Sequence, residues 1–205
     1  SEFRDGLRVT DAETLDIARM VLVGKVNSEI VGAINVHGPL AVGLSGFDAN
    51  LLRAGARDVD LGFVGDVHDV DPTIIHGLLA QGLIPVVATM ASDAGGQAYN
   101  INADTVAGAL AASLDAAKLV VLTDVDGVRR DALVPSSTIA RLSADELEAM
   151  VASGAASGGM APKAAACIAA VRAGVGAAHL LDGRVAHAVL LELFTDGGVG
   201  TMVVR

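Results

Sequence analysis

The sequence is short of the side chains that several classes of function require. Its single cysteine, Cys167, rules out an internal disulfide, which suits a reducing compartment. Tryptophan is absent, phenylalanine and tyrosine total five residues, and the formal net charge is −10. Nucleic-acid binding needs a basic surface, so this composition argues against a nucleic-acid partner.

Long apolar runs are also missing. No run is long enough to cross a bilayer, and the first residues, SEFRDGLRVTD, do not form a signal peptide. We therefore expect a soluble, cytoplasmic protein with no membrane partner. Hydrophobic residues make up 52% and charged residues 19% of the 205 positions, which excludes disorder and allows one or two domains with a sizeable core.

Several catalytic motifs are absent as well. The chain has no G-x-x-x-x-G-K-[ST] loop, no G-x-S-x-G elbow and no H-E-x-x-H pair, which excludes a P-loop NTPase and predicts no metal site. His179 and His187 are interpreted as packing or surface residues. Cys167 stands four residues from both Lys163 and Val171, so we expect a buried structural thiol on a helix.

Strands and helices are predicted to alternate along the chain. Apolar runs at 40–46, 83–91, 118–125, 177–183 and 200–205 read as strands, and the inner ones are continuous rather than alternating. Continuous apolar strands are typical of a mostly parallel sheet that is covered by helices on both faces.

The predicted helices lie between these runs. Residues 11–37 form one long helix, or two with a break near Gly24. Further helices are predicted at 104–114, 163–173 and 184–194, and a hairpin at 59–67. Two capping boxes are expected, one at Thr10 and Glu13 and the other at Ser143 and Glu146.

Three polar segments fall at the carboxyl ends of predicted strands or at helix starts, where open α/β sheets bind ligands. They are YNINADT (99–105), LTDVDGV (122–128) and GGMAPK (158–163). Lys163 would open a helix, where a fixed charge and backbone N–H groups can meet an anion; the alternative is a plain helix start after a flexible loop. Asn100, Asn102 and Asp104 are either ordinary caps or a functional cluster, and Arg8 is either an exposed arginine or a carboxylate clamp.

Together with AVGLSGFDANL, GFVGDV and HLLDGRVAHAVLLELFTDGGVGTMVV, these segments resemble the acetylglutamate kinases of the amino acid kinase family. The resemblance covers nearly every residue. It implies a three-layer αβα sandwich with a mostly parallel open sheet, in two lobes. Residues 1–114 would be the remainder of the N-terminal lobe that binds acetylglutamate, and residues 115–205 the C-terminal lobe that binds nucleotide.

The resemblance implies an enzyme of arginine biosynthesis that transfers the γ-phosphoryl group of ATP to the side-chain carboxylate of N-acetyl-L-glutamate. Arg8 and Asn100 would bind this substrate, Asp104 would orient the catalytic lysines, and Lys163 would stabilise the phosphoryl group in transfer. The nucleotide would be bound by Asp124, Val125, Asp126, Gly127, Val128, Arg129, Ala155, Ala156 and Ser157.

This reaction suits the residues that are present. A carboxylate nucleophile is already ionised at neutral pH, so no general base is needed. Mg²⁺ would arrive on the ATP phosphates. The resemblance also implies a homo-oligomer, with residues 11–37 as a candidate interface, and leaves room for an arginine effector near His179 and Glu192.

The chain departs from the family pattern at its start. The family's Lys-x-Gly-Gly and HGGG-type segments, which carry a second catalytic lysine, are not found here, and two internal stretches are short. We expect the 205-residue chain alone to bind nucleotide poorly and to be inactive. Two other functions stay open: a sister kinase that acts on another carboxylate, and a non-catalytic module that senses arginine.

Overall fold

The computed structural model describes residues 3–4, 7–131, 133–195 and 198–205, and the chain divides into two compact units. The first unit is Ser1–Val106 and the second is Ala107–Arg205. The division falls within helix α4 (Ala103–Ser113). The boundary predicted after residue 114 lies at the C-terminal end of the same helix.

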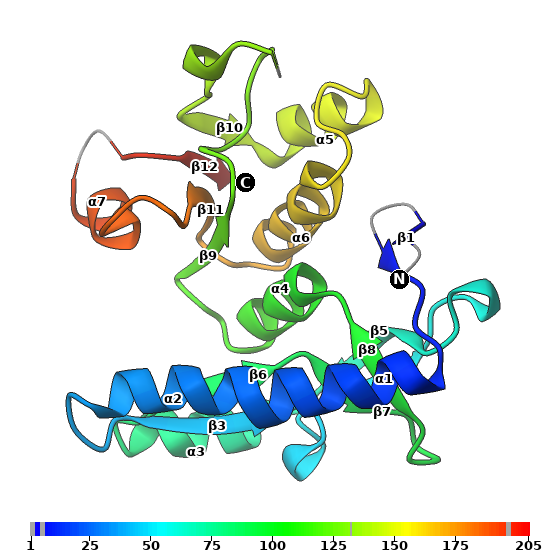
Figure 1. Cartoon of the computed structure of the whole chain (residues 1–205). Coiled ribbons are helices and arrows are strands. Elements are labelled where there is room, and N and C mark those ends of the chain that lie inside the picture. Colours follow the sequence, from blue (N-terminus) through cyan, green and yellow to red (C-terminus); the bar gives the residue numbers. More distant parts are fainter. Residues whose placement is uncertain (1–2, 5–6, 132, 196–197) are drawn as a thin grey trace. The chain divides into compact units, whose positions relative to one another are not determined.

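The first unit begins with a short β1 (Phe3–Arg4) and β2 (Leu7–Arg8) pair and a long helix (Figure 1). The helix runs through α1 (Ala12–Arg19), a π-helical segment (Met20–Val26) and α2 (Asn27–Asn35), so the chain continues through Gly24 without a break.

The capping box predicted at the start of this helix is wrong. Asp11 is the N-cap, and its carboxylate accepts a hydrogen bond from the Thr14 backbone N at 2.7 Å. The Thr10 backbone instead forms a bridge to Gly62, so the helix cannot begin at that residue.

A buried asparagine fastens the long helix to two parallel strands, β3 (Ala41–Ser45) and β6 (Ile84–Ala88). Asn27 Nδ2 donates to the carbonyl oxygens of Leu44 at 3.2 Å and Val86 at 2.8 Å. Helix α3 (Thr73–Ala80) also packs against β6. The predicted strands at 40–46 and 83–91 are confirmed, although the second ends at Ala88 and resumes after Thr89 as β7 (Met90–Ser92).

Four further strands of this unit pair in a closed ring in the order β4, β5, β8, β7. β4 (Leu52–Ala56) is antiparallel to β5 (Val64–Val70), and β8 (Ala98–Ile101) is parallel to β5 and antiparallel to β7. The hairpin predicted at 59–67 is therefore placed wrongly, because residues 59–61 form a 3₁₀ turn and only the second strand begins in that range.

The second unit contains a four-stranded sheet in the order β10, β12, β11, β9. β9 (Lys118–Thr123) is parallel to β11 (Ala177–Asp182), and β10 (Arg141–Ser143) is parallel to β12 (Thr201–Val204). The two pairs join in the antiparallel sense between β11 and β12, so the sheet is mixed rather than uniformly parallel.

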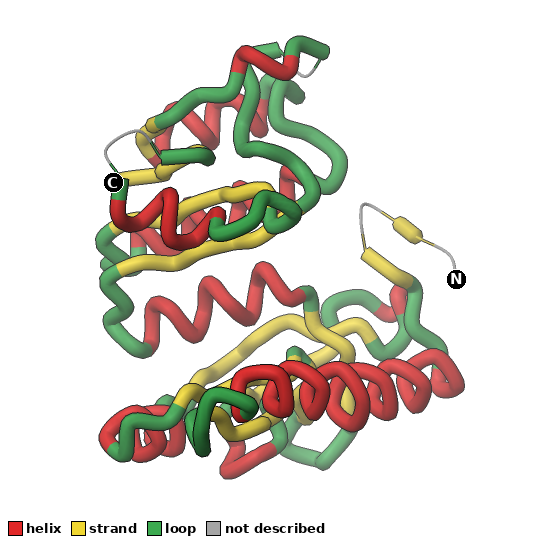
Figure 2. The backbone as a smooth tube through the Cα atoms, turned by 60° about the vertical axis from the view of Figure 1, so that its left-hand side comes forward, coloured by secondary structure: helices red, strands yellow, loops and turns green. Residues whose placement is uncertain are grey.

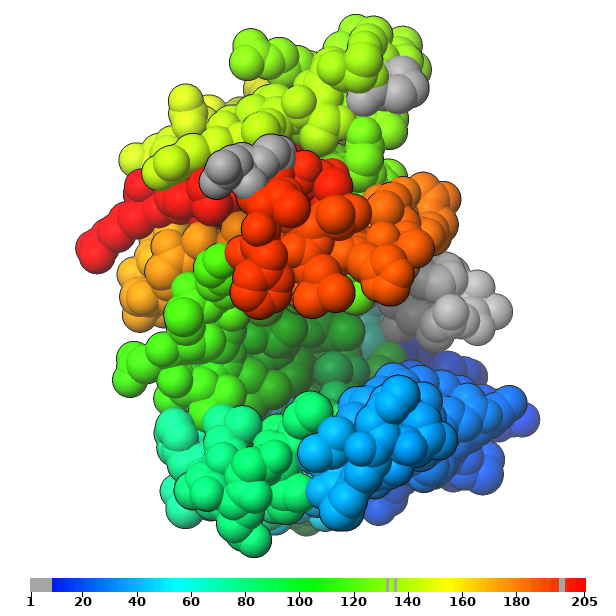
Figure 3. Space-filling model, turned by 90° about the vertical axis from the view of Figure 1, so that its left-hand side faces the viewer, coloured from blue at the N-terminus to red at the C-terminus, as the bar shows by residue number. Residues whose placement is uncertain are grey.

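Helices cover both faces of this sheet and give a three-layer α/β arrangement (Figures 1 and 2). α5 (Ala144–Ala152) and α6 (Met160–Arg172) lie on one face, and α7 (Ala188–Phe194) lies on the other. Figure 3 shows α7 in orange-red on the surface of its unit. Cys167 lies on α6 and is fully buried in the core of this unit, as its spacing predicted.

The capping box at Ser143 and Glu146 is confirmed at the start of α5. α6 begins at Met160, three residues before the predicted start, and α7 begins at Ala188 rather than at residue 184. Within the described part of the chain, no helix has the length and apolar character that crossing a bilayer requires.

Candidate nucleotide-binding pocket

The second unit holds a pocket of about 180 Å³ next to the carboxyl end of β9. Its walls come from two loops and the first residue of α6. The lining residues are Val125, Gly127, Val128, Arg129, Ala155, Ala156, Ser157 and Met160. Seven of the nine predicted nucleotide residues thus line one pocket, although the two segments are about thirty positions apart in sequence.

The first wall is the loop that follows β9, which folds back on itself. Ile139 N donates to the Val128 carbonyl oxygen at 2.8 Å, and Arg130 N donates to the Ser137 carbonyl oxygen at 3.0 Å. Gly127 has a φ of +135°, a conformation that residues with a side chain rarely adopt. The chain therefore turns at Asp126 and Gly127, and the turn brings Val128 to the pocket.

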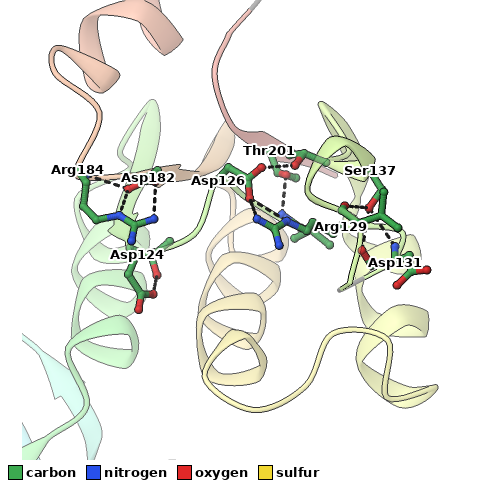
Figure 4. A network of polar contacts seen from close by, with 12 residues as sticks. Asp124, Asp126, Arg129, Asp131, Ser137, Asp182, Arg184 and Thr201 are labelled. Carbon is green, nitrogen blue, oxygen red and sulfur yellow. Dashed lines mark hydrogen bonds and ion pairs between the residues drawn. The ribbon is translucent and has the colours of Figure 1, made fainter.

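Asp126 does not line the pocket, because its own loop uses both carboxylate oxygens. Oδ1 accepts from Arg129 Nε at 3.0 Å and Nη2 at 2.7 Å, and Oδ2 accepts from Thr138 Oγ1 at 2.6 Å (Figure 4). Burial raises the pKa of Asp126, but the hydrogen bonds from Thr138 and Arg129 outweigh it and leave the pKa below its usual value. Asp126 thereby holds Arg129 against the pocket wall.

Asp124 also lies outside the pocket lining. Its carboxylate accepts a hydrogen bond from Thr123 Oγ1 at 3.2 Å. It stands at the same sheet edge as Asp182, the last residue of β11, which forms a two-point contact with Arg184 (Figure 4). Hydrogen bonds from Arg184 lower the pKa of Asp182 to about 2. Sequence reasoning missed this pair, although parallel strands bring their carboxyl ends to one edge.

The second wall is the loop 153–159 between α5 and α6. Ala156 is buried, and its N donates to the Met150 carbonyl oxygen at 3.0 Å. Arg172 connects the two helices, since its Nη2 lies 2.8 Å from an Asp145 oxygen and 2.7 Å from a Glu148 oxygen. The hydrogen bond from Arg172 is the main cause that lowers the pKa of Glu148. The α5–α6 pair therefore gives this loop fixed ends.

Lys163 is the fourth residue of α6 and is partly buried. It follows Met160, a pocket-lining residue, by three positions, which places both on one side of the helix. The expectation that Lys163 opens the helix is wrong. The first amides of α6 belong to Met160 and Ala161, and they already donate to the carbonyl oxygens of Ser157 and Gly158. Sequence reasoning missed Met160, which the structure places in the pocket lining.

The predicted substrate residues belong to the first unit. Arg8 is in β2, where it pairs with Phe3, and its side chain is outside the described part of the structure. Asn100 is in β8, partly buried, and its N donates to the Phe63 carbonyl oxygen at 2.9 Å.

The cap before α4 belongs to Asn102 rather than to Asp104. Asn102 Oδ1 accepts from the Asp104 N at 2.9 Å and from the Thr105 N at 3.1 Å. The ordinary capping role thus belongs to Asn102, and Asp104 is a partly buried residue of the first turn of α4. The substrate roles of Arg8 and Asn100 and the catalytic roles of Asp104 and Lys163 stay predictions.

A second polar cluster of the C-terminal unit is buried. His179 Nδ1 lies 2.8 Å from Glu192 Oε1, and the two side chains are 3% and 5% exposed. Glu192 Oε2 accepts from Val199 N at 2.7 Å and from Gly200 N at 3.1 Å. Burial raises the pKa of Glu192, but the hydrogen bonds from His179, Val199 and Gly200 outweigh burial and lower it. His179 is thus a paired residue rather than a plain packing residue.

Comparison with known proteins identifies relatives along nearly the whole chain. Residues 1–182 match the amino acid kinase family. The acetylglutamate kinase of Symbiobacterium thermophilum is 54% identical and aligns with 100% of this chain and 73% of its own length. The acetylglutamate kinase of Saccharopolyspora erythraea is 57% identical and aligns with 98% of this chain and 68% of its own length.

Solved structures with a similar fold also match along nearly the whole chain. The N-acetylglutamate synthase of Neisseria gonorrhoeae, in complex with coenzyme A and N-acetyl-glutamate, is 29% identical with a TM-score of 0.84, and the match covers 100% of this chain and 46% of the synthase. The same synthase in complex with coenzyme A and L-arginine is 30% identical with a TM-score of 0.82, over 99% of this chain and 48% of the synthase.

Proposed function

This chain belongs to the amino acid kinase family, and from that premise we propose that it transfers the γ-phosphoryl group of ATP to the side-chain carboxylate of N-acetyl-L-glutamate. The observation that carries the proposal is sequence similarity: the chain is 54% and 57% identical to two acetylglutamate kinases over nearly all of its length. The pocket of the C-terminal unit supports it, because residues that the family resemblance assigns to nucleotide binding gather there.

In this reaction the protein itself needs to form or break no covalent bond. A carboxylate oxygen of N-acetyl-L-glutamate attacks the γ-phosphorus of ATP, the bond from that phosphorus to the bridging oxygen breaks, and ADP leaves with the electron pair. The product is an acyl phosphate. No proton has to be removed from the nucleophile, so catalysis depends on in-line positioning and on neutralising charge on the phosphoryl oxygens.

Named residues take up these tasks. Val125, Val128 and the other pocket-lining residues hold the nucleotide, with apolar side chains for the base and Arg129 as a cation at the wall. By the family resemblance, Lys163 would stabilise charge on the phosphoryl group as a mobile ammonium, and Asp104 would orient the catalytic lysines. Arg8 and Asn100 bind the carboxylate substrate.

Mg²⁺ would reach the reaction on the ATP phosphates. Among the described residues, no three histidine, cysteine or carboxylate side chains gather as ligands for a metal ion. Mg²⁺ commonly keeps several waters and is held by substrate phosphates with few protein ligands, so we expect it to enter with the nucleotide. Bound there, it would neutralise charge on the β- and γ-phosphates.

Arginine is a second ligand that an observation favours. The Neisseria gonorrhoeae synthase, which is similar over 99% of this chain, was solved in complex with coenzyme A and L-arginine. We extend this to an inhibitory arginine site in the C-terminal unit near His179 and Glu192. A homo-oligomer, with the long helix of residues 12–35 as an interface element, belongs to the same proposal. Arginine titration of kinase activity and the sedimentation mass test the two.

The central experiment measures acyl-phosphate formation. The protein, at the length at which its organism makes it, is incubated with Mg-ATP and one acid at a time, and the acyl phosphate is trapped with hydroxylamine. The acids are N-acetyl-L-glutamate, an N-acetylated aminoadipate, L-aspartate and carbamate. We expect kcat/KM for N-acetyl-L-glutamate to exceed the others by at least about tenfold.

Each alternative gives a different result. Preference for another acid would reassign the protein to a sister kinase of the same family. A folded protein that binds arginine but neither binds Mg-ATP nor forms any acyl phosphate would be a regulatory module, and the proposal would be wrong.

A further inference from the structure

The hydroxyl group of Thr201 joins two ends of the loop that forms the first wall of the pocket. Thr201 lies on β12 and is fully buried. Its Oγ1 accepts a hydrogen bond from Val128 N at 2.9 Å and donates one to the Ile139 carbonyl oxygen at 2.7 Å. Figure 4 shows Thr201 beside this loop and next to Asp126 and Arg129. One side chain on β12 thus binds both ends of a loop that is more than sixty positions away in sequence.

The chemistry of this contact requires a hydroxyl. A hydroxyl both donates and accepts, so it pairs a backbone N–H and a backbone carbonyl at once. Val128 is 2% exposed, so removal of Oγ1 would leave a buried N–H without its hydrogen-bond partner. An unpaired buried N–H is costly, so the loop would shift to find another partner.

At Gly127 the loop also approaches β12 so closely that no side chain fits between them. A Cβ placed on Gly127 would overlap Thr201 Oγ1 and lie 3.1 Å from Thr201 N. The left-handed φ of Gly127 is part of the same contact. The position of the loop against β12 is therefore set where Thr201 meets Gly127 and Val128, and both of these loop residues line the pocket.

We infer that Thr201 is a positioning residue for nucleotide binding: its hydroxyl fixes Gly127, Val128 and Arg129 against the nucleotide without itself lining the pocket. The inference rests on the proposed function, because it takes the occupant of the pocket to be ATP. Loss of the hydroxyl loosens the attachment of the loop to β12 at Val128 and weakens ATP binding. The KM for N-acetyl-L-glutamate and kcat at saturating ATP change little.

Three variants separate this role from a general structural one. Thr201→Val removes the hydroxyl at constant shape, and Thr201→Ser keeps it. Thr195→Val makes the same chemical change in the same unit, where Thr195 Oγ1 donates to the Leu191 carbonyl oxygen at 2.6 Å and lines no part of the pocket. The dissociation constant of Mg-ATP is measured by calorimetry well below each melting temperature, and hydrogen exchange is followed at the Val128 amide.

We expect Thr201→Val to weaken ATP binding by about tenfold and to speed exchange at Val128, while Thr201→Ser stays within about threefold of the parent. Thr195→Val should leave both readouts unchanged. A Thr201→Val protein that melts earlier but binds ATP as tightly as the parent would overturn the inference.

Folding failures also give an answer. If Thr201→Val does not fold, Thr201→Ala replaces it, and failure of both to fold even with saturating Mg-ATP would make Thr201 a folding residue and refute the positioning role. All variants are made in the protein at the length at which its organism makes it, and if that parent protein binds no ATP, the proposed function fails instead. Exchange at Val128 still decides whether the hydroxyl holds the loop, so the two failures are distinguishable.

Discussion

Removing the buried carboxylate of Glu192 should destabilise the protein strongly at neutral pH. The carboxylate has three hydrogen-bond partners, His179 Nδ1 and the backbone N atoms of Val199 and Gly200. Glu192→Ala leaves all three without their acceptor in a site where the two side chains are at most 5% exposed. Breaking a buried pair by removing one partner costs about 3–5 kcal/mol, so we expect a loss of that size in the free energy of unfolding.

Glu192→Gln separates charge from shape. Its side-chain oxygen can still accept from the two backbone N–H groups, but its amide cannot accept the proton on His179 Nδ1. We expect a smaller loss of roughly 1–3 kcal/mol. Glu13→Gln, at an exposed position in the first turn of α1, is the matched control and should leave the unfolding curve nearly unchanged.

The dependence on pH gives the sharper test. The pKa of Glu192 is lowered from its ordinary value of 4.5 in the folded protein. Such a group contributes stability that is complete above its unfolded pKa and is lost as the pH falls through the folded pKa. The difference in stability between the parent and Glu192→Gln should therefore be constant above about pH 5.5 and shrink as the pH drops below about 4.5.

Urea unfolding followed by circular dichroism, at a series of pH values, measures these quantities. The reasoning would be refuted by a Glu192→Ala protein that loses less than about 1 kcal/mol at neutral pH. A difference between the parent and Glu192→Gln that stays constant down to about pH 3.5 would refute it as well, because the charge on Glu192 would then contribute nothing.

Three further predictions follow from the pocket and the long helix. Lys163→Ala should lower kcat by roughly 10²–10³ with a much smaller change in ATP affinity, and an unchanged kcat in the hydroxamate assay would remove Lys163 from catalysis. Gly127→Ala should cost more than about 1 kcal/mol of stability and also weaken ATP binding, because φ is +135° and the new Cβ meets Thr201; calorimetry and melting curves check both. Asn27→Ala should cost about 2–3 kcal/mol in urea unfolding, since Leu44 and Val86 lose a buried donor, and a loss below about 0.5 kcal/mol would contradict this.

Local signals in the sequence predicted the elements that depend on local interactions. The capping box at Ser143 and Glu146 is formed within one turn of chain, and the continuous apolar run at 118–125 needs only burial on both faces to become a strand. Thr10 and Glu13 have the same spacing, yet they do not cap a helix. The Thr10 backbone pairs with Gly62, and nothing near Thr10 in the sequence reveals that pairing.

The start of α6 shows a different limit. The sequence predicts a helix that begins at Lys163, directly after Pro162. The structure instead has Pro162 as the third residue of a helix that starts at Met160. Proline is tolerated there because the first-turn N–H groups have no intrahelical partners to lose. The sequence could not distinguish among these first-turn positions, so the place of Lys163 was missed by one turn.

The candidate pocket was predictable only as far as the family resemblance extended. Composition and spacing alone left the segments at 122–128 and 158–163 as plausible ligand sites, and the resemblance assigned the residues that line the pocket. Thr201 had no signal, since a threonine on a terminal strand has the same local pattern whether or not its hydroxyl closes a distant loop. Its contacts span sixty-two and seventy-three positions, and only the paired sheet brings them together.

Asp126 shows that a residue assigned to a binding site by resemblance need not contact the ligand with its own side chain. The resemblance places Asp126 among the nucleotide residues, but both of its carboxylate oxygens accept hydrogen bonds from Arg129 and Thr138. A carboxylate beside ATP would also repel the phosphates, whereas a carboxylate paired with Arg129 fixes the guanidinium and cancels part of that repulsion. Asp126 therefore acts on the pocket through Arg129, and the same reasoning applies to Thr201: residues of this loop that line the pocket are held in place by side chains that do not line it.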